Sequence, residues 1–175
     1  MKTKDLVYVG IYLALVLVLD LTKEMIPFLN LPFGGSINIA LIPLTVASFH
    51  LGYKKAMLIG VMWWAIGSLM GFNEWYLNFM QYSLDYIVPS IILALSSIFY
   101  SHKTNKAMFM GISLMMIIRT ISIAISGVYY WADGVVAGSL AAWIVSLKYN
   151  VPYSLVTLVV LLIVVPIILK QIRIN

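Results

Sequence analysis

Six long apolar segments, separated by polar connections, constrain the fold of this chain more than any other feature. Each is close to the roughly 20 residues that a helix needs to cross a bilayer. Open sheets cannot satisfy their backbone groups in lipid, so helices are the expected spanning elements. The sequence therefore predicts an all-α integral membrane protein with six transmembrane helices. The expected spans are Leu6–Leu21, Ser36–Tyr53, Ala56–Phe72, Met80–Tyr100, Ala107–Trp131 and Val151–Leu169.

The composition agrees with a membrane protein and excludes several kinds of site. Of the 175 residues, 63% are hydrophobic and 10% are charged, whereas soluble domains average about 45–50% apolar and 25% charged residues. The absence of cysteine excludes disulfides, thiol chemistry and cysteine-bound metals. With two histidines and no histidine–carboxylate cluster, we expect no metal site. The whole chain, residues 1–175, is expected to form a single six-helix membrane domain.

The lysines and arginines alternate between the two sides of the predicted membrane. Eight of the eleven lie at the termini or in the second and fourth connections, two lie in the other connections, and Arg119 lies within the fifth helix. Positively charged loops stay on the cytoplasmic side, so both the N- and C-termini are expected in the cytoplasm. Because the basic residues flank apolar segments, we expect contact with the lipid bilayer and no nucleic-acid partner. The eight are Lys2, Lys4, Lys54, Lys55, Lys103, Lys106, Lys170 and Arg173.

Asp85 is the one acidic residue that lies well inside a predicted span and away from its ends. A charged residue at the centre of a membrane helix costs about 2.5–3.5 kcal/mol, and such residues usually mark a functional site. Gln81 lies four residues earlier on the same helix face, and Tyr86 follows directly. One interpretation is an ion pair with Arg119 that neutralises both charges. The interpretation we favour is that Asp85 faces a cavity open to the outer side and binds a polar or cationic ligand.

Aromatic residues are concentrated at the same outer depth. Trp131 ends the fifth predicted helix, and Phe33 lies in the first outer loop. Tyr149 and Asn150 open the sixth helix. Tryptophan and tyrosine are typical of membrane interfaces, but the short inner loops hold far fewer of them. Because aromatic faces bind cations with about 0.5–2 kcal/mol per contact, the pattern predicts an outer pocket for a small, flat molecule that is neutral or cationic.

Two features of other helices each have two interpretations. Trp63 lies in the middle of the third predicted helix, where an interfacial position does not explain it, and it either lines the floor of the pocket or faces lipid. Gly10 and Ala14 are small residues four apart in the first helix, a spacing that permits close helix contact. Such a pair serves either packing within the chain or docking of another membrane subunit.

Signatures of catalysis are absent from the sequence. It contains no nucleotide-binding loop, no nucleophile–base pair and no HExxH motif, so we expect no catalytic residue and no enzymatic activity. An intramembrane enzyme is an alternative that would need a second catalytic group near Asp85. A channel or stand-alone transporter is another, yet a pore predicts polar residues throughout, and the inner halves of these helices are almost wholly apolar. A scaffold subunit would not need aromatic residues clustered around one buried acid.

In these residues and their order, the chain resembles the substrate-binding S-components of energy-coupling factor vitamin transporters, and most of all their thiamine-specific branch. The resemblance implies a high-affinity thiamine-binding subunit that holds no cofactor and has no enzymatic activity. It implies three partners, a transmembrane coupling protein and two cytoplasmic ATPases that use ATP. It also implies a multi-pass protein of a bacterial plasma membrane. The segments that carry the resemblance are Gly10–Ala14, Gly34–Leu44, Gln81–Tyr86, Arg119–Trp131 and Ser146–Tyr153.

The resemblance also assigns roles to individual residues. Asp85 takes the place of an acidic residue, often glutamate, that contacts the ligand, and Trp131 takes the place of a tryptophan that stacks on it. Gly10 and Ala14 match the partner-docking position of the family. Ile123 departs from the family, which commonly has histidine there, so a thiamine precursor or another ring-bearing vitamin is the alternative ligand. The expected ligand-binding residues are Asp85, Trp131, Tyr149, Asn150, Tyr86, Gln81, Phe33 and Trp63.

Overall fold

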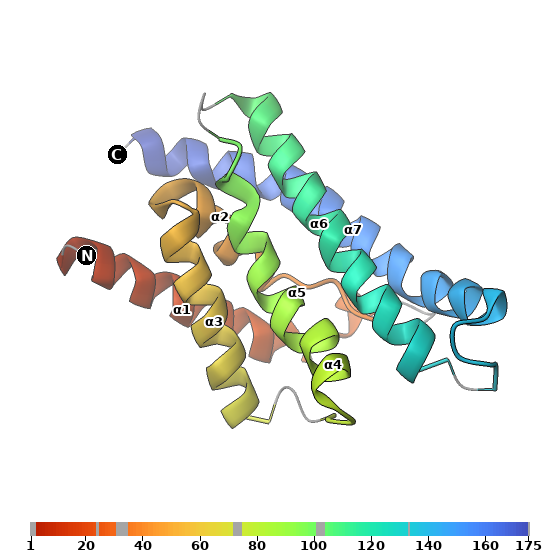
Figure 1. Ribbon diagram of the computed structural model, residues 1–175. Coiled ribbons are helices and arrows are strands. Elements are labelled where there is room, and N and C mark those ends of the chain that lie inside the picture. Colours follow the sequence, from red (N-terminus) through yellow and green to blue (C-terminus); the bar gives the residue numbers. More distant parts are fainter. Residues whose placement is uncertain are drawn as a thin grey trace.

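The regular structure is helical throughout the described residues of the computed structural model, which are 3–23, 25–30, 35–71, 75–100, 104–132 and 134–174 (Figure 1). The side chains of residues 23, 173 and 174 are not described. A single backbone bridge pairs Asn30 with Ser36. The all-α prediction is thus confirmed for this part of the chain. The elements are α1 (Thr3–Lys23), η1 (Pro27–Leu29), α2 (Leu41–Leu51), α3 (Tyr53–Leu69), α4 (Phe79–Tyr82), η2 (Ser83–Ile87), α5 (Val88–Ile91), η3 (Ile92–Ser97), α6 (Asn105–Tyr130) and α7 (Leu140–Ile174).

The elements α4, η2, α5 and η3 follow one another without a break, so the described chain forms six long or medium helical bodies that match the six predicted segments. Both marked chain ends lie on the left in Figure 1, whereas the α6–α7 connection lies at the lower right. Within the described residues, four helices are long and apolar enough to cross a membrane. They are Thr3–Thr22, Phe79–Ser97, Asn105–Tyr130 and Leu140–Ile172.

The second predicted span is wrong in its length. A helix was expected over Ser36–Tyr53, but α2 covers only 11 residues, Leu41–Leu51. At about 1.5 Å per residue, this helix is much shorter than the roughly 30 Å hydrocarbon core of a bilayer. It ends at Gly52, whose φ of 87° lies outside the helical region. Apolar composition alone could not distinguish this short helix and the backbone before it from one continuous span.

The sixth predicted helix is wrong at its start. Val151 was expected to begin it, but α7 begins at Leu140 and contains 35 residues. Ser139 provides the local reason, because its hydroxyl accepts a hydrogen bond from the Ala142 amide at 3.2 Å, as a helix N-cap does. Pro152 lies inside the helix and does not mark its beginning. The residues expected to open this helix, Tyr149 and Asn150, therefore lie in its interior.

The fourth helical body, Phe79–Ser97, changes its hydrogen-bonding pattern along its length. The side chain of Asn78 caps α4 by accepting a hydrogen bond from the Gln81 amide at 2.9 Å. The backbone then forms a π-helical turn, η2, which contains Asp85, and later ends as the 3-10 helix η3. Pro89 lacks an amide hydrogen, so the Asp85 carbonyl has no α-helical donor four residues ahead. The proline thus accounts for irregular backbone next to the acidic residue.

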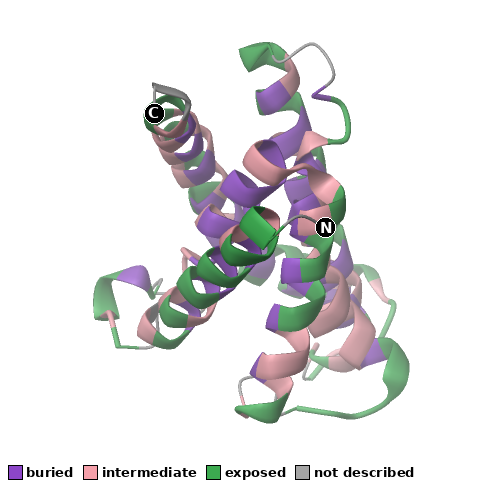
Figure 2. Ribbon diagram, turned by 90° about the vertical axis from the view of Figure 1, so that its left-hand side faces the viewer, coloured by how far each residue is buried: buried purple, intermediate pink, exposed green. Residues whose placement is uncertain are grey.

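The core lies between helices α1, α2 and α3, the second half of Phe79–Ser97, the first half of α6 and the second half of α7. Figure 2 shows buried residues gathered in the middle of the bundle and exposed ones on its outer faces. Many of the exposed residues are apolar, which suits contact with lipid tails. Large side chains that are fully buried are Leu41, Leu44, Ile59, Leu93, Ile112, Met116 and Leu161.

Candidate functional site

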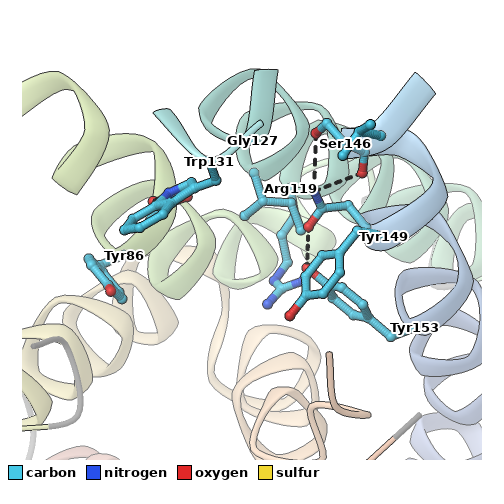
Figure 3. Close-up of a pocket in the computed structure, with 11 residues that line it drawn as sticks. Tyr86, Arg119, Gly127, Trp131, Ser146, Tyr149 and Tyr153 are labelled. Carbon is cyan, nitrogen blue, oxygen red and sulfur yellow. Dashed lines mark hydrogen bonds between the residues drawn. The ribbon is translucent and has the colours of Figure 1, made fainter. Parts of the chain in front are cut away.

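A cavity of about 460 Å³ lies between the irregular segment Phe79–Ser97, α6 and α7 (Figure 3). Its volume falls in the range of about 300–1,000 Å³ that is typical of sites for small molecules. Its elements meet at the end of the bundle that is far from both marked chain ends in Figure 1. The lining residues are Asp85, Tyr86, Arg119, Ile123, Gly127, Trp131, Val145, Ser146, Tyr149, Asn150 and Tyr153.

Asp85 lies at the centre of a hydrogen-bond network on one side of this cavity. Its Oδ2 atom accepts hydrogen bonds from Gln81 Nε2 at 2.7 Å and from Trp131 Nε1 at 2.8 Å. Gln81 is fully buried, and its Oε1 accepts a hydrogen bond from the Leu77 amide at 3.1 Å. The carboxylate is therefore fixed by two neutral donors and keeps its negative charge available to a ligand. The predicted association of Gln81 with Asp85 is present as a direct contact.

Arg119 brings a buried positive charge to the same cavity. Its side chain is only 7% exposed, and its Nε and Nη1 atoms have no hydrogen-bond partner among the described residues. No ion pair or hydrogen bond joins it to Asp85 in the described part of the chain. The interpretation in which these two charges neutralise each other by direct contact is therefore not observed. Buried N–H groups without partners are costly, and here they line a space that a polar ligand group or water could occupy.

The α7 side of the cavity presents polar groups from successive turns. Asn150 Nδ2 donates to the Ser146 carbonyl at 3.0 Å and to Ser146 Oγ at 3.2 Å, and the Tyr153 hydroxyl donates to Asn150 Oδ1 at 2.6 Å. Ser146 Oγ in turn donates to the Ala124 carbonyl of α6 at 2.7 Å. Asn150 is thus held rigidly at the cavity wall. The sequence interpretation assigned ligand contacts to Tyr149 and Asn150 but not to Ser146 or Tyr153, although both lie in the segment Ser146–Tyr153 that carries the family resemblance.

The α6 side consists of Ile123, Gly127 and Trp131, which lie four residues apart and so share one helix face. A β-carbon at Gly127 would overlap the Ser146 side chain and would lie 3.2 Å from Asn150 Nδ2. This glycine therefore allows α7 to approach closely and leaves room for the cavity. Ile123, at the position where the family resemblance led us to expect histidine, contributes an apolar side chain to the wall.

Aromatic rings face one another across the cavity. Figure 3 shows Tyr86 and Trp131 on one side and Tyr149 and Tyr153 on the other, with Arg119 between them. Trp131 is 40% exposed and packs edge to face against Trp75, with their ring centroids 6.2 Å apart. Tyr149 and Tyr153 also meet edge to face at 6.0 Å. Such a space, with a carboxylate at one side, can bind a flat ring and stabilise a positive charge on it.

Some predicted residues lie elsewhere. Trp63 lines a second, smaller cavity and not the main one. Phe33 lies outside the described residues. Gly10 and Ala14 lie on an exposed face of α1, and a β-carbon at Gly10 would meet nothing within 4 Å. Packing within the chain therefore does not explain this pair. Among the described residues, no group of three or more histidine, cysteine or acidic side chains could hold a metal ion.

Comparisons with other proteins give a consistent result. A family model described as a thiamine transporter protein matches residues 6–174. The thiamine transporter ThiT of Bacillus subtilis (strain 168) is 27% identical over 169 residues, which cover 89% of this chain and 84% of that protein. A solved structure of ThiT from Listeria monocytogenes has a TM-score of 0.70 at 22% identity and covers 92% of this chain and 94% of that one. The structural similarity establishes a shared fold.

Proposed function

The chain belongs to the thiamine transporter protein family, and on this premise we propose that it binds thiamine in the cavity beside Asp85. It is a transport protein and not an enzyme. The observation that carries the proposal is the Asp85 carboxylate, held by Gln81 and Trp131 at 2.7 and 2.8 Å within an aromatic-lined cavity. Thiamine combines a permanently cationic thiazolium ring with a flat aminopyrimidine ring, and both features match this environment.

The ligand makes contact with both sides of the cavity in this proposal. The Asp85 charge and the Trp131 ring face the thiazolium, since a carboxylate and an aromatic surface both favour a cation. The α7 side, with Tyr149, Asn150 and Tyr153, faces the neutral ring. The apolar side chain of Ile123 replaces the histidine expected from the family resemblance, so an apolar contact takes the place of a polar one. A thiamine precursor or another ring-bearing vitamin is the competing ligand.

We further propose that the protein is a multi-pass S-component of a bacterial plasma membrane with both termini in the cytoplasm. The position of the cavity at the opposite end of the bundle from both chain ends supports an opening on the outer side. The partners are a transmembrane coupling protein and two cytoplasmic ATPases that use ATP. The exposed α1 face around Gly10 and Ala14 is the docking surface for the coupling protein, because small side chains permit close helix contact.

Titration of the purified protein with thiamine tests the ligand. Trp131 donates to Asp85 and lies 40% exposed at the cavity, so ligand binding should quench tryptophan fluorescence at submicromolar thiamine. Parallel titrations with the isolated aminopyrimidine precursor and with riboflavin or biotin provide the comparison. Strong quenching by one of these and none by thiamine would contradict the proposed ligand but not the family.

Leucine substitutions on α1 test the docking surface separately. Gly10→Leu and Ala14→Leu should leave thiamine affinity unchanged, because both residues lie on an exposed face and neither lines the cavity. Uptake of radiolabelled thiamine in cells that also make the partner subunits should fall strongly, since the added side chains prevent close approach of a second helix. Normal uptake by both variants would exclude this face as the docking surface.

A further inference from the structure

A second cavity of about 160 Å³ lies next to the main one. The two share Asp85, Tyr86 and Arg119 in their walls. The remaining walls of the smaller cavity come from α1, α3, the fourth helical body and the segment before α2, which contributes Asn38. The ligand site therefore continues into a smaller compartment whose walls are mostly polar.

Arg119 supplies hydrogen-bond donors to this compartment. Its side chain is 7% exposed and lines both cavities. Its Nε and Nη1 atoms have no hydrogen-bond partner among the described residues. A guanidinium has five N–H donors and no acceptor, and buried donors without a partner are costly. An oxygen atom that enters the smaller cavity beside Arg119 would therefore be stabilised as an acceptor.

Asn38 supplies an acceptor to the same compartment. Its Oδ1 atom is buried and has no hydrogen-bond partner within the described part of the chain. The backbone holds the residue in place, because the Asn38 carbonyl accepts a hydrogen bond from the Leu41 amide at 3.3 Å, where α2 begins. A side-chain amide oxygen can accept two hydrogen bonds. The smaller cavity therefore has an unused acceptor as well as unused donors.

This combination restricts the chemistry of a group that fits the smaller cavity. An ammonium group only donates hydrogen bonds, an ionised carboxylate only accepts them, and an alkyl group does neither. A hydroxyl group both donates and accepts, so it can serve Asn38 as well as Arg119. The hydroxyl of an alcohol and that of a water molecule share this chemistry.

We propose that the smaller cavity is a subsite for an alcohol hydroxyl, namely the one that ends the hydroxyethyl chain of thiamine. The inference rests on the proposed function, since it states which substituent of the vitamin enters which cavity. Asp85 lines both cavities and faces the thiazolium in the proposed arrangement. A chain attached to that ring thus begins where the two cavities meet, and the aminopyrimidine stays in the main cavity beside α7. Arg119 and Asn38 are then specificity-determining residues.

Isothermal titration calorimetry with two ligands tests this subsite. One ligand is thiamine, and the other is the analogue in which an ethyl group replaces the hydroxyethyl group. The ratio of their dissociation constants isolates the contribution of the hydroxyl. Because one of the two hydrogen bonds involves a charged donor, the unmodified protein should prefer thiamine by about thirtyfold. Asn38→Ala should lower this preference by about threefold, and Arg119→Gln by about tenfold.

Asn150→Ala is the matched control for Asn38→Ala, because Asn150 lines the main cavity and not the smaller one. It should weaken the binding of both ligands by a similar factor and leave the ratio unchanged. Asn38→Ala should weaken mainly the binding of thiamine. A ratio that falls as far in Asn150→Ala as in Asn38→Ala would overturn the inference.

Two further results would also overturn it. Equal affinity of the unmodified protein for both ligands would mean that only water occupies the smaller cavity. A preference for thiamine that is undiminished in Asn38→Ala and Arg119→Gln would place the hydroxyl elsewhere. If Arg119→Gln does not fold, Asn38→Ala and the two ligands on the unmodified protein still decide the question. Absence of binding of both ligands to the unmodified protein would instead contradict the proposed function itself.

Discussion

Two walls of the same cavity are built in different ways. The Phe79–Ser97 wall passes through α-helical, π-helical and 3-10 geometry and carries Asp85 in its π-helical turn. The α6 wall is a regular helix of 26 residues that presents Ile123 and Gly127, and Trp131 follows directly after its last residue. The irregular wall supplies the carboxyl group of Asp85, whereas the regular wall supplies the guanidinium of Arg119 and the apolar shape of the cavity. Irregular helical turns are frequent at functional sites, and here the irregular turn η2 contains Asp85.

The difference implies different effects of substitution on the two walls. On the irregular wall, Asp85 accepts hydrogen bonds from Gln81 and Trp131, so changes there should act mainly on ligand affinity. On the regular wall, Gly127 faces Ser146 and Asn150 of α7, so changes there should act on packing as well as on affinity. The following substitutions separate these two kinds of effect.

Asp85→Ala should have the largest effect. It removes the charge that faces the ligand and leaves the Gln81 and Trp131 donors without their acceptor. The loss of one partner of a desolvated charge pair costs about 2–5 kcal/mol, so thiamine affinity should fall by at least about thirtyfold. Tryptophan fluorescence titration measures the dissociation constant. Asp85→Asn keeps a hydrogen-bond acceptor but removes the charge, so its thiamine affinity should lie between those of the unmodified protein and Asp85→Ala. Equal affinity in these three proteins would show that the charge of Asp85 does not contribute to binding.

Gly127→Ala should have the next largest effect and should also lower thermal stability. The added β-carbon overlaps the Ser146 side chain and separates α6 from α7. Overpacking of this kind costs about 1–3 kcal/mol, and we expect about a tenfold loss of affinity together with a lower melting temperature. Gly10→Ala is the matched control, because a β-carbon there meets nothing within 4 Å. A Gly127→Ala variant that binds thiamine more weakly but has an unchanged melting temperature would contradict the prediction that substitutions on the α6 wall also affect packing.

Trp131→Phe tests the contact that joins the two walls. The phenyl ring preserves an aromatic surface but removes the Nε1 donor to Asp85. Since a single hydrogen bond contributes about 0.5–1.5 kcal/mol, affinity should fall by about fivefold. Calorimetry is the suitable measurement, because the substitution also removes a fluorescent residue. A loss as large as that of Asp85→Ala would show that the indole, and not the carboxylate, is the principal ligand contact.

Tyr153→Phe should have the smallest effect of the four. It removes the hydroxyl that donates to Asn150 Oδ1 at 2.6 Å, while the two donor contacts of Asn150 to Ser146 remain. We expect a two- to threefold loss of affinity, near the lower limit for one hydrogen bond of about 0.5 kcal/mol. Thr157→Val is a useful control on the same helix, because its hydroxyl donates to the Tyr153 carbonyl and does not line the main cavity. An effect of Tyr153→Phe above tenfold would assign the hydroxyl a direct ligand contact.

For the Phe79–Ser97 wall, the sequence predicted which side chains lie together better than it predicted the backbone conformation. The spacing of four identified Gln81 as the neighbour of Asp85, and the two form a hydrogen bond at 2.7 Å. The π-helical turn could not be predicted from apolar composition, although Pro89, four residues after Asp85, was the available signal. On the other side of the cavity, Ser146 was not assigned to the site because it lay before the predicted helix start at Val151, whereas α7 begins at Leu140.

The sequence alone determined that the chain is helical, that Asp85 is the exceptional acidic residue, and that aromatic residues gather at one end. These properties follow from local rules: helices satisfy their own backbone in an apolar environment, and each residue's neighbours on a helix are fixed by spacing. Tertiary structure decided which charges meet. Arg119 could have paired with Asp85, but no ion pair joins them in the described part of the chain, and the helix packing brings Asp20 and Trp63 into a small cavity that Arg119 and Asp85 also line. Which charged residues of different helices come together depends on how the helices pack, and the residue pattern within a single helix cannot predict it.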